Sequence, residues 1–465
     1  MLFPALGLAL AGVCALVLTA EARPRGTQGT RFAALSGPVQ ADAPVAVAVK
    51  RQQVGDNTRL IFDLSREVGV SAFVLAGPDR VIVDLPEVNF QLDAMAGQPT
   101  APERAKGKAK DAPKSTELIS SFRFGHLGPG KSRVVIDLGA PAKIVKAFSE
   151  KMTDGDPAHL IIELAPTDAA QFAAAAAQAP RPTRVVTPDV PKKPEPPRIK
   201  AAQSDKPLVI LDPGHGGVDT GAAGAFDSVE KHIVLDFAKE LATKLEASGK
   251  VRVQLTRTSD VFVSLGGRVK LARDSGAGLF VSLHADSLRE GGVAGATVYT
   301  VSDRASDREA ARVAEQENQA DANAGIEVAE DQSDVTDILF DLTRRETRAY
   351  SHVYARTLVN YWKVAGKLNK NPQRSAGFVV LKAPDVPSIL LELGYLSSKQ
   401  DAESLMSREW RDKTTNAVAQ SIESFFAPRT PTKAEAAVGV DHNSTGTIAV
   451  RSENGASSSL RSIIP

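Results

Sequence analysis

Two histidines and two glutamates have the residue types of a metal-dependent hydrolase site. His215 follows the apolar start of LVILDPGHGG, His284 follows LFVSL, Glu392 follows SILL, and Glu230 lies shortly after the glycine-rich loop. Imidazole nitrogens and carboxylate oxygens bind zinc, and a catalytic zinc site uses three protein ligands and keeps a fourth position for water. A further carboxylate can take a proton from this water and pass it to a leaving amine.

We predict that one zinc ion is bound by His215, Glu230 and His284, and that Glu392 transfers the proton without being a ligand. Asp227 and His232 lie close to Glu230 in the sequence and remain alternatives to it. The glycine loop does not follow the GxxxxGK[ST] order of a phosphate-binding loop, and no GxSxG segment indicates a serine hydrolase. The sequence therefore favours a zinc-activated water.

A parallel sheet would bring these residues together, because functional groups collect beyond the carboxyl ends of parallel strands. Strands are expected from residue 208 into the glycine loop and at 251–256, 279–286, 297–301, 377–381 and 388–392, with helices at 228–248, 264–276 and 405–426. The first helix has apolar residues on one face at Val229, Ile233, Phe237, Leu241 and Leu245. This alternation predicts an α/β catalytic domain over residues 207–427, with a mostly parallel central sheet flanked by helices.

Four similar runs, TRLIFDLS, DRVIVDLP, SRVVIDLG and AHLIIELA, recur between residues 58 and 165. Each has a polar residue, several β-forming residues, and then an acidic residue followed by leucine. The repetition predicts a separate all-β sandwich over residues 46–165, built as two similar halves. No acid/base pair recurs in these runs, so we expect no catalysis there.

The ends and joints of the chain differ in composition from the two domains. Residues 1–22 hold an apolar run and a small-x-small pattern, which predicts a cleaved signal peptide; an uncleaved anchor is the alternative, because no basic residue precedes the run. Residues 23–45 and 428–465 are expected to be disordered. The Pro-, Ala- and Lys-rich segment 166–206 is expected to be a semi-extended linker that leaves the domains free to reorient.

The charge balance and the cysteine content limit which binding partners and which disulfides the sequence supports. Lys and Arg total 56 and Asp and Glu total 55, so the charge gives no argument for nucleic acid or an anionic membrane. Cys14, the single cysteine, lies in the signal segment, and the mature chain can form no disulfide. Beyond the signal, no run is long and apolar enough to span a bilayer. We expect an exported protein without a membrane span after signal cleavage.

The segments LDPGHGG, VEKHIVLDFAKEL, SLHAD and GFVVLKAPDVPSILLELGYLSS resemble the zinc-dependent N-acetylmuramoyl-L-alanine amidases of the Amidase_3 type. The resemblance covers about residues 207 to 427. It implies hydrolysis of the amide between N-acetylmuramic acid and the L-alanine of the stem peptide in peptidoglycan. It also implies that His215, Glu230 and His284 bind zinc and that Glu392 is catalytic.

The repeated runs and FRFGHLGPGKSRVVIDL resemble the AMIN domain, a β-sandwich attached to exported cell-wall enzymes. This resemblance implies that the sandwich directs the protein to peptidoglycan at the division site; a structural spacer is the alternative. Together the two resemblances imply a periplasmic enzyme that is enriched at the septum and acts in daughter-cell separation.

About 75 residues separate TVYTV from GFVVL, too many for a simple connection. Their apolar spacing predicts a helical insertion over 302–376. One interpretation is an ordinary peripheral layer. The other follows from the division-associated amidases that the segment resembles, in which an inserted helix covers the zinc site. Glu317, and after it Glu315, would then close the open position until a LytM-type activator moves the helix.

Two other functions fit parts of this pattern. A peptidoglycan-binding protein with a non-catalytic zinc site would bind the wall without turnover, whereas in an amidase Glu392→Ala should remove turnover and spare binding. A carboxypeptidase would trim the stem peptide, and only an amidase frees the intact stem peptide from the glycan. Mass spectrometry of the products separates these functions.

Overall fold

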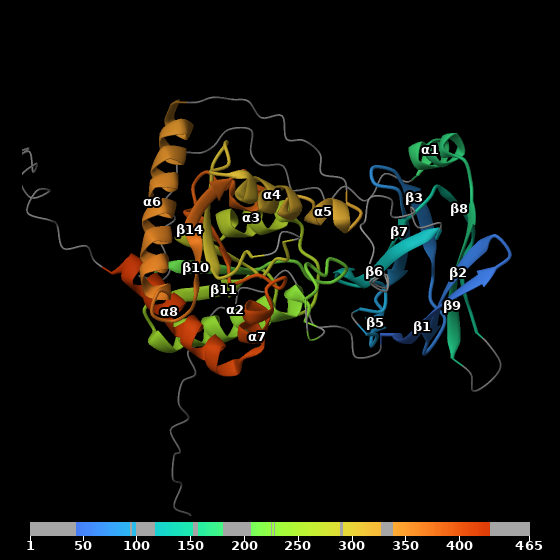
Figure 1. Ribbon diagram of the computed structural model, residues 1–465, viewed down its shortest axis with the longest axis horizontal. Coiled ribbons are helices and arrows are strands. Elements are labelled where there is room, and N and C mark those ends of the chain that lie inside the picture. The colour runs from blue at the N-terminus through green and yellow to red at the C-terminus, as the bar shows by residue number, and fades with distance from the viewer. Residues whose placement is uncertain are drawn as a thin grey trace, which may run out of the picture.

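The computed structural model describes residues 43–93, 95–98, 117–151, 157–179, 206–224, 226, 228–288, 292–326 and 338–427. Within them, a β-sandwich packs against an α/β domain (Figure 1). The linker composition predicts domains that are free to reorient, and the structure describes one arrangement in which they are in contact. The predicted signal peptide at 1–22, most of the segment 23–45, most of the linker and the whole tail at 428–465 lie outside the described residues.

The sandwich consists of a five-stranded sheet, β5-β1-β2-β9-β8, and a four-stranded sheet, β3-β4-β7-β6. Its strands are β1 (Val45–Val54), β2 (Asn57–Leu64), β3 (Ser71–Leu75), β4 (Arg80–Pro86), β5 (Asn89–Phe90), β6 (Ile119–Gly128), β7 (Lys131–Leu138), β8 (Ala142–Glu150) and β9 (Ala158–Pro166). The four repeated runs form β2, β4, β7 and β9, and they pair across the two halves, β2 with β9 and β4 with β7. The predicted all-β sandwich is confirmed.

A helix, α1 (Ala169–Gln178), occupies the start of the predicted linker. Asp168 caps it by accepting a hydrogen bond from the Gln171 amide, and Phe172 is buried against the sandwich core. Alanine is the strongest helix former, and after Pro166 the next proline of the linker comes only at Pro180. The prediction of a non-helical linker was therefore wrong for its first part.

The α/β domain has a six-stranded sheet in the order β11-β10-β12-β15-β13-β14. The strands are β10 (Leu208–Pro213), β11 (Arg252–Leu255), β12 (Leu279–His284), β13 (Ala296–Val301), β14 (Leu368–Ala376) and β15 (Ser388–Glu392). Only the β13–β15 pair is antiparallel. The predicted mostly parallel sheet is confirmed.

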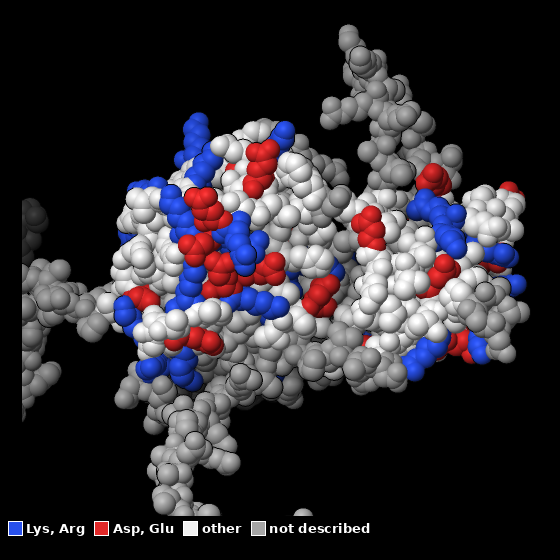
Figure 2. Space-filling model, turned by 90° about the horizontal axis from the view of Figure 1, so that it is seen from below, with Lys and Arg blue, Asp and Glu red and all other residues white. Residues whose placement is uncertain are grey.

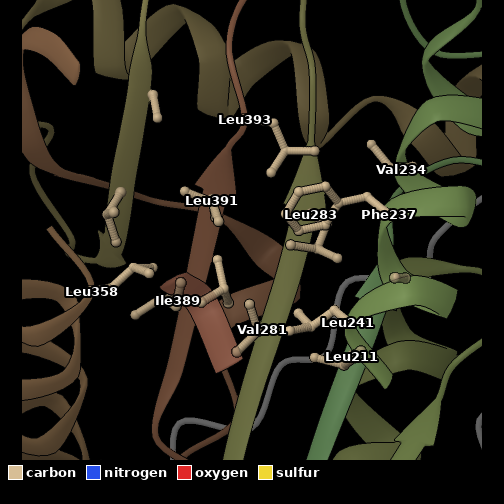
Figure 3. Close-up of a cluster of buried hydrophobic side chains, with 14 of the residues drawn as sticks. Leu211, Val234, Phe237, Leu241, Val281, Leu283, Leu358, Ile389, Leu391 and Leu393 are labelled. Carbon is tan, nitrogen blue, oxygen red and sulfur yellow. The ribbon is translucent and has the colours of Figure 1, made fainter. Parts of the chain in front are cut away.

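Helices cover both faces of this sheet (Figure 1). They are α2 (Glu230–Ser248), α3 (Leu265–Asp274), α4 (Arg308–Glu317), α5 (Ala320–Asn323), α6 (Ile338–Trp362), the 3-10 helix η1 (Val379–Leu381), α7 (Lys399–Met406) and α8 (Arg408–Phe426). Side chains alternate between the faces of a strand. Leu211 and Val281 therefore face α2, α6 and α8 (Figure 3), whereas Ile210 and Phe280 face α3 and α4.

The region between β13 and β15 differs from the prediction. The apolar run GFVVL was expected to be a strand, but Val379–Leu381 form η1. The edge strand is instead the polar segment β14, which contains Pro372, a residue tolerated at a sheet edge. The insertion 302–376 therefore contributes a strand as well as helices, and α6 packs into the main core through Leu358 and Trp362.

The C-terminal helix is also divided. A single helix was expected over 405–426, whereas Ser407 ends α7 and caps α8 by accepting a hydrogen bond from the Trp410 amide. The face seen in Figure 2 mixes acidic and basic side chains, in keeping with the near-zero net charge. Among the described helices, none combines the length and the apolar character that a bilayer crossing needs.

Candidate metal centre

The predicted site residues meet at the carboxyl edge of the central sheet. His215 lies two residues beyond β10, His284 ends β12, Glu392 ends β15, and Glu230 is the first residue of α2. From β10 the chain passes to β11 on one side and then crosses to β12 on the other, and such a change of direction leaves a crevice at the carboxyl ends of the strands. The parallel register then sets His284 directly opposite Glu392.

Three ligand atoms face one another with the spacing of a zinc site. The Glu230 Oε1 atom lies 3.2 Å from His215 Nε2 and 3.2 Å from His284 Nδ1. Zinc bonds of about 2.0–2.1 Å place tetrahedral ligands about 3.3 Å apart. Both nitrogens are buried, and within the described residues neither has a partner with hydrogen-bond geometry, although carboxylate oxygens lie 3.0–3.2 Å away. Buried polar atoms without partners are rare, so these residues fit a cation.

The electrostatics also fit a cation. Burial by itself lowers the pKa of a histidine, yet Glu317 and Glu230 raise the pKa of His284 to about 10. Glu230 likewise helps to raise the pKa of His215 despite its burial. Burial raises the pKa of Glu392 to about 8. Glu230 and Glu317 thus place negative charge beside both imidazoles, and a divalent metal would neutralise that charge.

Glu317, the last residue of α4, lies in this cluster. Its Oε2 atom is 3.0 Å from His284 Nδ1 and 3.6 Å from His215 Nε2, so it faces the same two nitrogens as Glu230. Glu315 is exposed on the same helix and lies outside the cluster. The two residues differ because α4 buries Ala310, Val313, Ala314 and Glu317, a stripe at helical spacing that includes only the second glutamate.

Asp219 was missing from the predicted site. Its Oδ2 atom lies 2.9 Å from His215 Nδ1, which fixes the ring orientation and leaves Nε2 free for a metal. His215 itself has a positive φ of 57°, a strained conformation for a residue other than glycine. A carboxylate four residues beyond a predicted histidine ligand was the signal that could have identified Asp219, because metal-binding histidines usually donate their second nitrogen to an acceptor.

Two buried arginines hold the loop that carries His215, and sequence reasoning missed both. Arg268 donates to the His215 carbonyl at 2.8 Å and to Asp212, while Arg257 donates to the Gly214 carbonyl at 2.8 Å. Gly214 allows His284 to approach this loop, since a Cβ there would lie 2.4 Å from the imidazole ring. The loop is therefore rigid where it presents its histidine.

Asp286 connects Glu392 with the insertion. Its amide donates to Glu392 Oε2 at 3.0 Å, and its Oδ1 accepts a hydrogen bond from Gln316 of α4 at 2.8 Å. The other oxygen of Glu392, Oε1, is buried without a partner. Glu392 is thus anchored through one oxygen and keeps the other available for a proton.

Of the two alternatives to Glu230, only His232 lies within the described residues. His232 points away from the cluster and is half exposed, with Nε2 3.6 Å from Asp260. Asp227 lies outside the described residues. Glu230 is fully buried, and the Ala222 and Ala285 amides donate to its two oxygens at 2.8 Å each.

Two family models match the chain. The model described as N-acetylmuramoyl-L-alanine amidase matches residues 209–424, and the AMIN domain model matches residues 46–164. The first covers the α/β domain with the histidine and glutamate cluster, and the second covers the sandwich.

Named relatives resemble the chain along most of its length. "N-acetylmuramoyl-L-alanine amidase AmiC" of Escherichia coli O6:H1 is 31% identical over 392 residues, which cover 82% of this chain and 89% of the relative. The protein of the same name from Neisseria meningitidis serogroup B is 29% identical and covers 86% and 96%. "N-acetylmuramoyl-L-alanine amidase AmiA" of Salmonella typhimurium is 39% identical over 231 residues, covering 50% and 79%.

Proposed function

Because the chain belongs to the N-acetylmuramoyl-L-alanine amidase family and is thus a peptidoglycan amidase, we propose that it cleaves its substrate with zinc bound by His215, Glu230 and His284. The observation that carries this proposal is the convergence of two buried imidazole nitrogens on one carboxylate oxygen. The bond cleaved is the amide between N-acetylmuramic acid and the L-alanine of the stem peptide.

Zinc in this position would polarise the amide carbonyl and make a water molecule acidic enough to attack it near neutral pH. The protein supplies the geometry. Asp219 holds the His215 ring, the amides of Ala222 and Ala285 hold Glu230, and Arg257 and Arg268 hold the loop.

Glu392 is the proposed general base and acid. Its Oε2 is held by the Asp286 amide, so Oε1 can receive a proton from the attacking water and deliver it to the L-alanine nitrogen as the amide bond breaks. Its place at the end of β15, opposite His284, supports a role beside the metal ligands.

We further propose that the enzyme is autoinhibited by Glu317. The distances of 3.0 and 3.6 Å to the two ligand nitrogens support a carboxylate in the fourth metal position, where it would exclude water and substrate. Moving α4 would open the position. An activator protein of the LytM type is the proposed cause of that movement.

The proposed setting is the periplasm at the division septum. The family relationship and the AMIN match support a cell-wall location, and the sandwich is the proposed peptidoglycan-targeting domain. Daughter-cell separation is the process that this location and activity would serve.

The test of the activity is product analysis on purified sacculi. Zinc-loaded protein, activated by Glu317→Gln, should release intact stem peptide. Adding Glu392→Gln should abolish release while zinc content and wall binding persist. Adding Glu315→Gln instead should leave release unchanged, because Glu315 is exposed outside the cluster. Release of single terminal amino acids would refute the amidase assignment, and full release with Glu392→Gln would refute the role of that residue.

A further inference from the structure

Three arginines of the sandwich contact residues 322–325 of the insertion, shortly after Glu317. Arg80 of β4 donates to the Ala322 carbonyl, and Arg123 of β6 donates to the Asn323 carbonyl at 3.2 Å. Arg133 of β7 donates to the carbonyls of Ala324 and Gly325, at 2.8 and 2.9 Å. Figure 1 shows α5 lying between α4 and the sandwich. The last carbonyls of a helix have no partner within the helix, and here arginines supply one.

Two of these arginines are fixed by carboxylates within the sandwich. Arg133 makes a bidentate pair with Asp84, and Arg123 makes one with Asp137. Arg133 and Arg80 are nearly fully buried in the contact. The guanidinium groups of Arg123 and Arg133 are therefore held in place before they meet the insertion, so little side-chain entropy is lost when they bind its carbonyls.

Apolar packing joins the same three parts. One cluster contains Phe73, Leu75, Ile82 and Val135 of the sandwich, Val218 and Phe262 of the catalytic domain, and Ala324 of the insertion. Gly325 has a φ of 70°, and a Cβ there would lie 2.8 Å from the Ile82 side chain. The insertion is thus seated tightly on the sandwich.

The sandwich also contacts the loop beyond His215. The carbonyl of His126 in β6 accepts hydrogen bonds from the amides of Val218 and Phe262, at 3.3 and 3.2 Å. A Cβ on Gly125 would lie 2.3 Å from the backbone of Gly217. One face of the sandwich therefore touches both the metal-binding loop and the segment that follows the inhibitory glutamate.

The arginine contacts at residues 322–325 lie only a few residues beyond Glu317 in the chain. Between them, Asn318 bonds to the Gly377 carbonyl and the Val379 amide, and Asp321 accepts a hydrogen bond from the Leu265 amide. The segment 317–326 is thus held on one side by the catalytic domain and on the other by the sandwich. A movement that shifts the whole segment 317–326 would withdraw Glu317 and also disturb the arginine contacts at residues 322–325.

We propose that the sandwich is a clamp that holds the insertion closed, with Arg80, Arg123 and Arg133 as positioning residues that act through Glu317. This inference rests on the proposed autoinhibition. Separation of the sandwich from residues 322–325 lowers the barrier to opening the metal site. The sandwich thereby couples its own placement on the wall to the activity of the domain beside it.

The test uses the full-length, zinc-loaded protein. Arg80→Met with Arg123→Met keeps most of each aliphatic stem and removes the donors. Gly325→Ala disturbs the same contact from the insertion side. Arg51→Met is the matched control, because Arg51 pairs with Glu117 elsewhere in the sandwich. Arg80→Lys with Arg123→Lys restores a single cationic nitrogen donor group at each position and should partly restore the slow exchange and the low hydrolysis of the wild type.

Two readouts are measured: hydrogen exchange of residues 308–326 and basal hydrolysis of sacculi without activator. We expect faster exchange and roughly a tenfold rise in hydrolysis, since one hydrogen bond to a charged group contributes about that factor to an equilibrium. Unchanged exchange and hydrolysis in both the double arginine variant and Gly325→Ala, with thermal unfolding as in the wild type, would overturn the clamp.

The proposed autoinhibition fails in a different way. If Glu317→Gln leaves basal hydrolysis unchanged while the arginine variants speed exchange at 308–326, the clamp stands and the inhibitory role of Glu317 is wrong. If Glu317→Gln raises hydrolysis and the arginine variants alter neither readout, autoinhibition stands and the clamp is wrong.

Discussion

Replacing Glu317 by glutamine is the most direct probe of the closed site. The side chain keeps its size, so the buried stripe of α4 formed by Ala310, Val313 and Ala314 can pack as before. What changes is the charge of the group that lies 3.0 Å from His284 and 3.6 Å from His215. A neutral amide is a much poorer partner for a metal or an imidazolium than a carboxylate.

The expected gain follows from that single contact. A hydrogen bond to a charged group contributes about 1.5–3 kcal/mol, and each 1.4 kcal/mol is a factor of ten in an equilibrium constant. If closed protein greatly outnumbers open protein, basal kcat/KM should rise by about 10- to 100-fold. The Gln316–Asp286 hydrogen bond still holds α4 in part, so full activation is not expected.

The assay is release of stem peptide from purified sacculi, without activator, by protein of verified zinc content. Glu315→Gln is the matched control, because it makes the same chemical change two residues earlier on the exposed side of α4. A rise of less than twofold in Glu317→Gln, or an equal rise in Glu315→Gln, would refute the inhibitory geometry. A loss of bound zinc in Glu317→Gln alone would indicate a structural ligand instead.

Three further changes address the ligands and the core. Asp219→Asn keeps the shape of the residue beside His215 but removes its charge, and zinc affinity measured against a chelator should fall about 10- to 100-fold; Asp274→Asn, exposed on α3, should leave it unchanged. Gly214→Ala adds a Cβ 2.4 Å from the His284 ring, so zinc content after dialysis should fall, and full retention would contradict the close approach. Leu391→Ala empties a fully buried position of the main core, and urea titration should show a loss of about 2–5 kcal/mol in unfolding free energy; a loss below 1 kcal/mol would mean that the position is poorly packed.

The site was largely predictable because its residues follow local signals. His215, His284 and Glu392 each come after a short apolar strand, and parallel strands end at one edge of their sheet. Strand polarity therefore brings those three residues to one edge, and the strand order, with β12 between β10 and β15, makes them neighbours. The assignment of Glu230 as a ligand depended on the family resemblance, because Asp227 and His232 beside it could also bind a metal. In the structure Glu230 is buried, whereas His232 is half exposed.

Errors arose where apolar patterning was weak or ambiguous. The strand β14 lies at the edge of the sheet, where a strand pairs on one side only and can be polar. The apolar run GFVVL therefore predicted a strand at a place where the structure has η1. The helix α1 was not expected, because the proline-rich segment that follows it made the whole linker look non-helical. The helical spacing of Ala310, Val313 and Ala314 continues to Glu317 and not to Glu315, so this spacing favours Glu317 as the buried glutamate of α4.

The sequence by itself determined the two domain types, the parallel sheet and the chemical character of the cluster at its edge, because period and residue type are local properties. Tertiary structure alone decided which groups from distant segments complete that cluster. Asp219 takes up the second nitrogen of His215, and Glu317 reaches the ligands only because α4 lies over the sheet. The arginine contacts join residues about 200 positions apart, and no local pattern encodes such a meeting, because it depends on how two separately folded cores pack together.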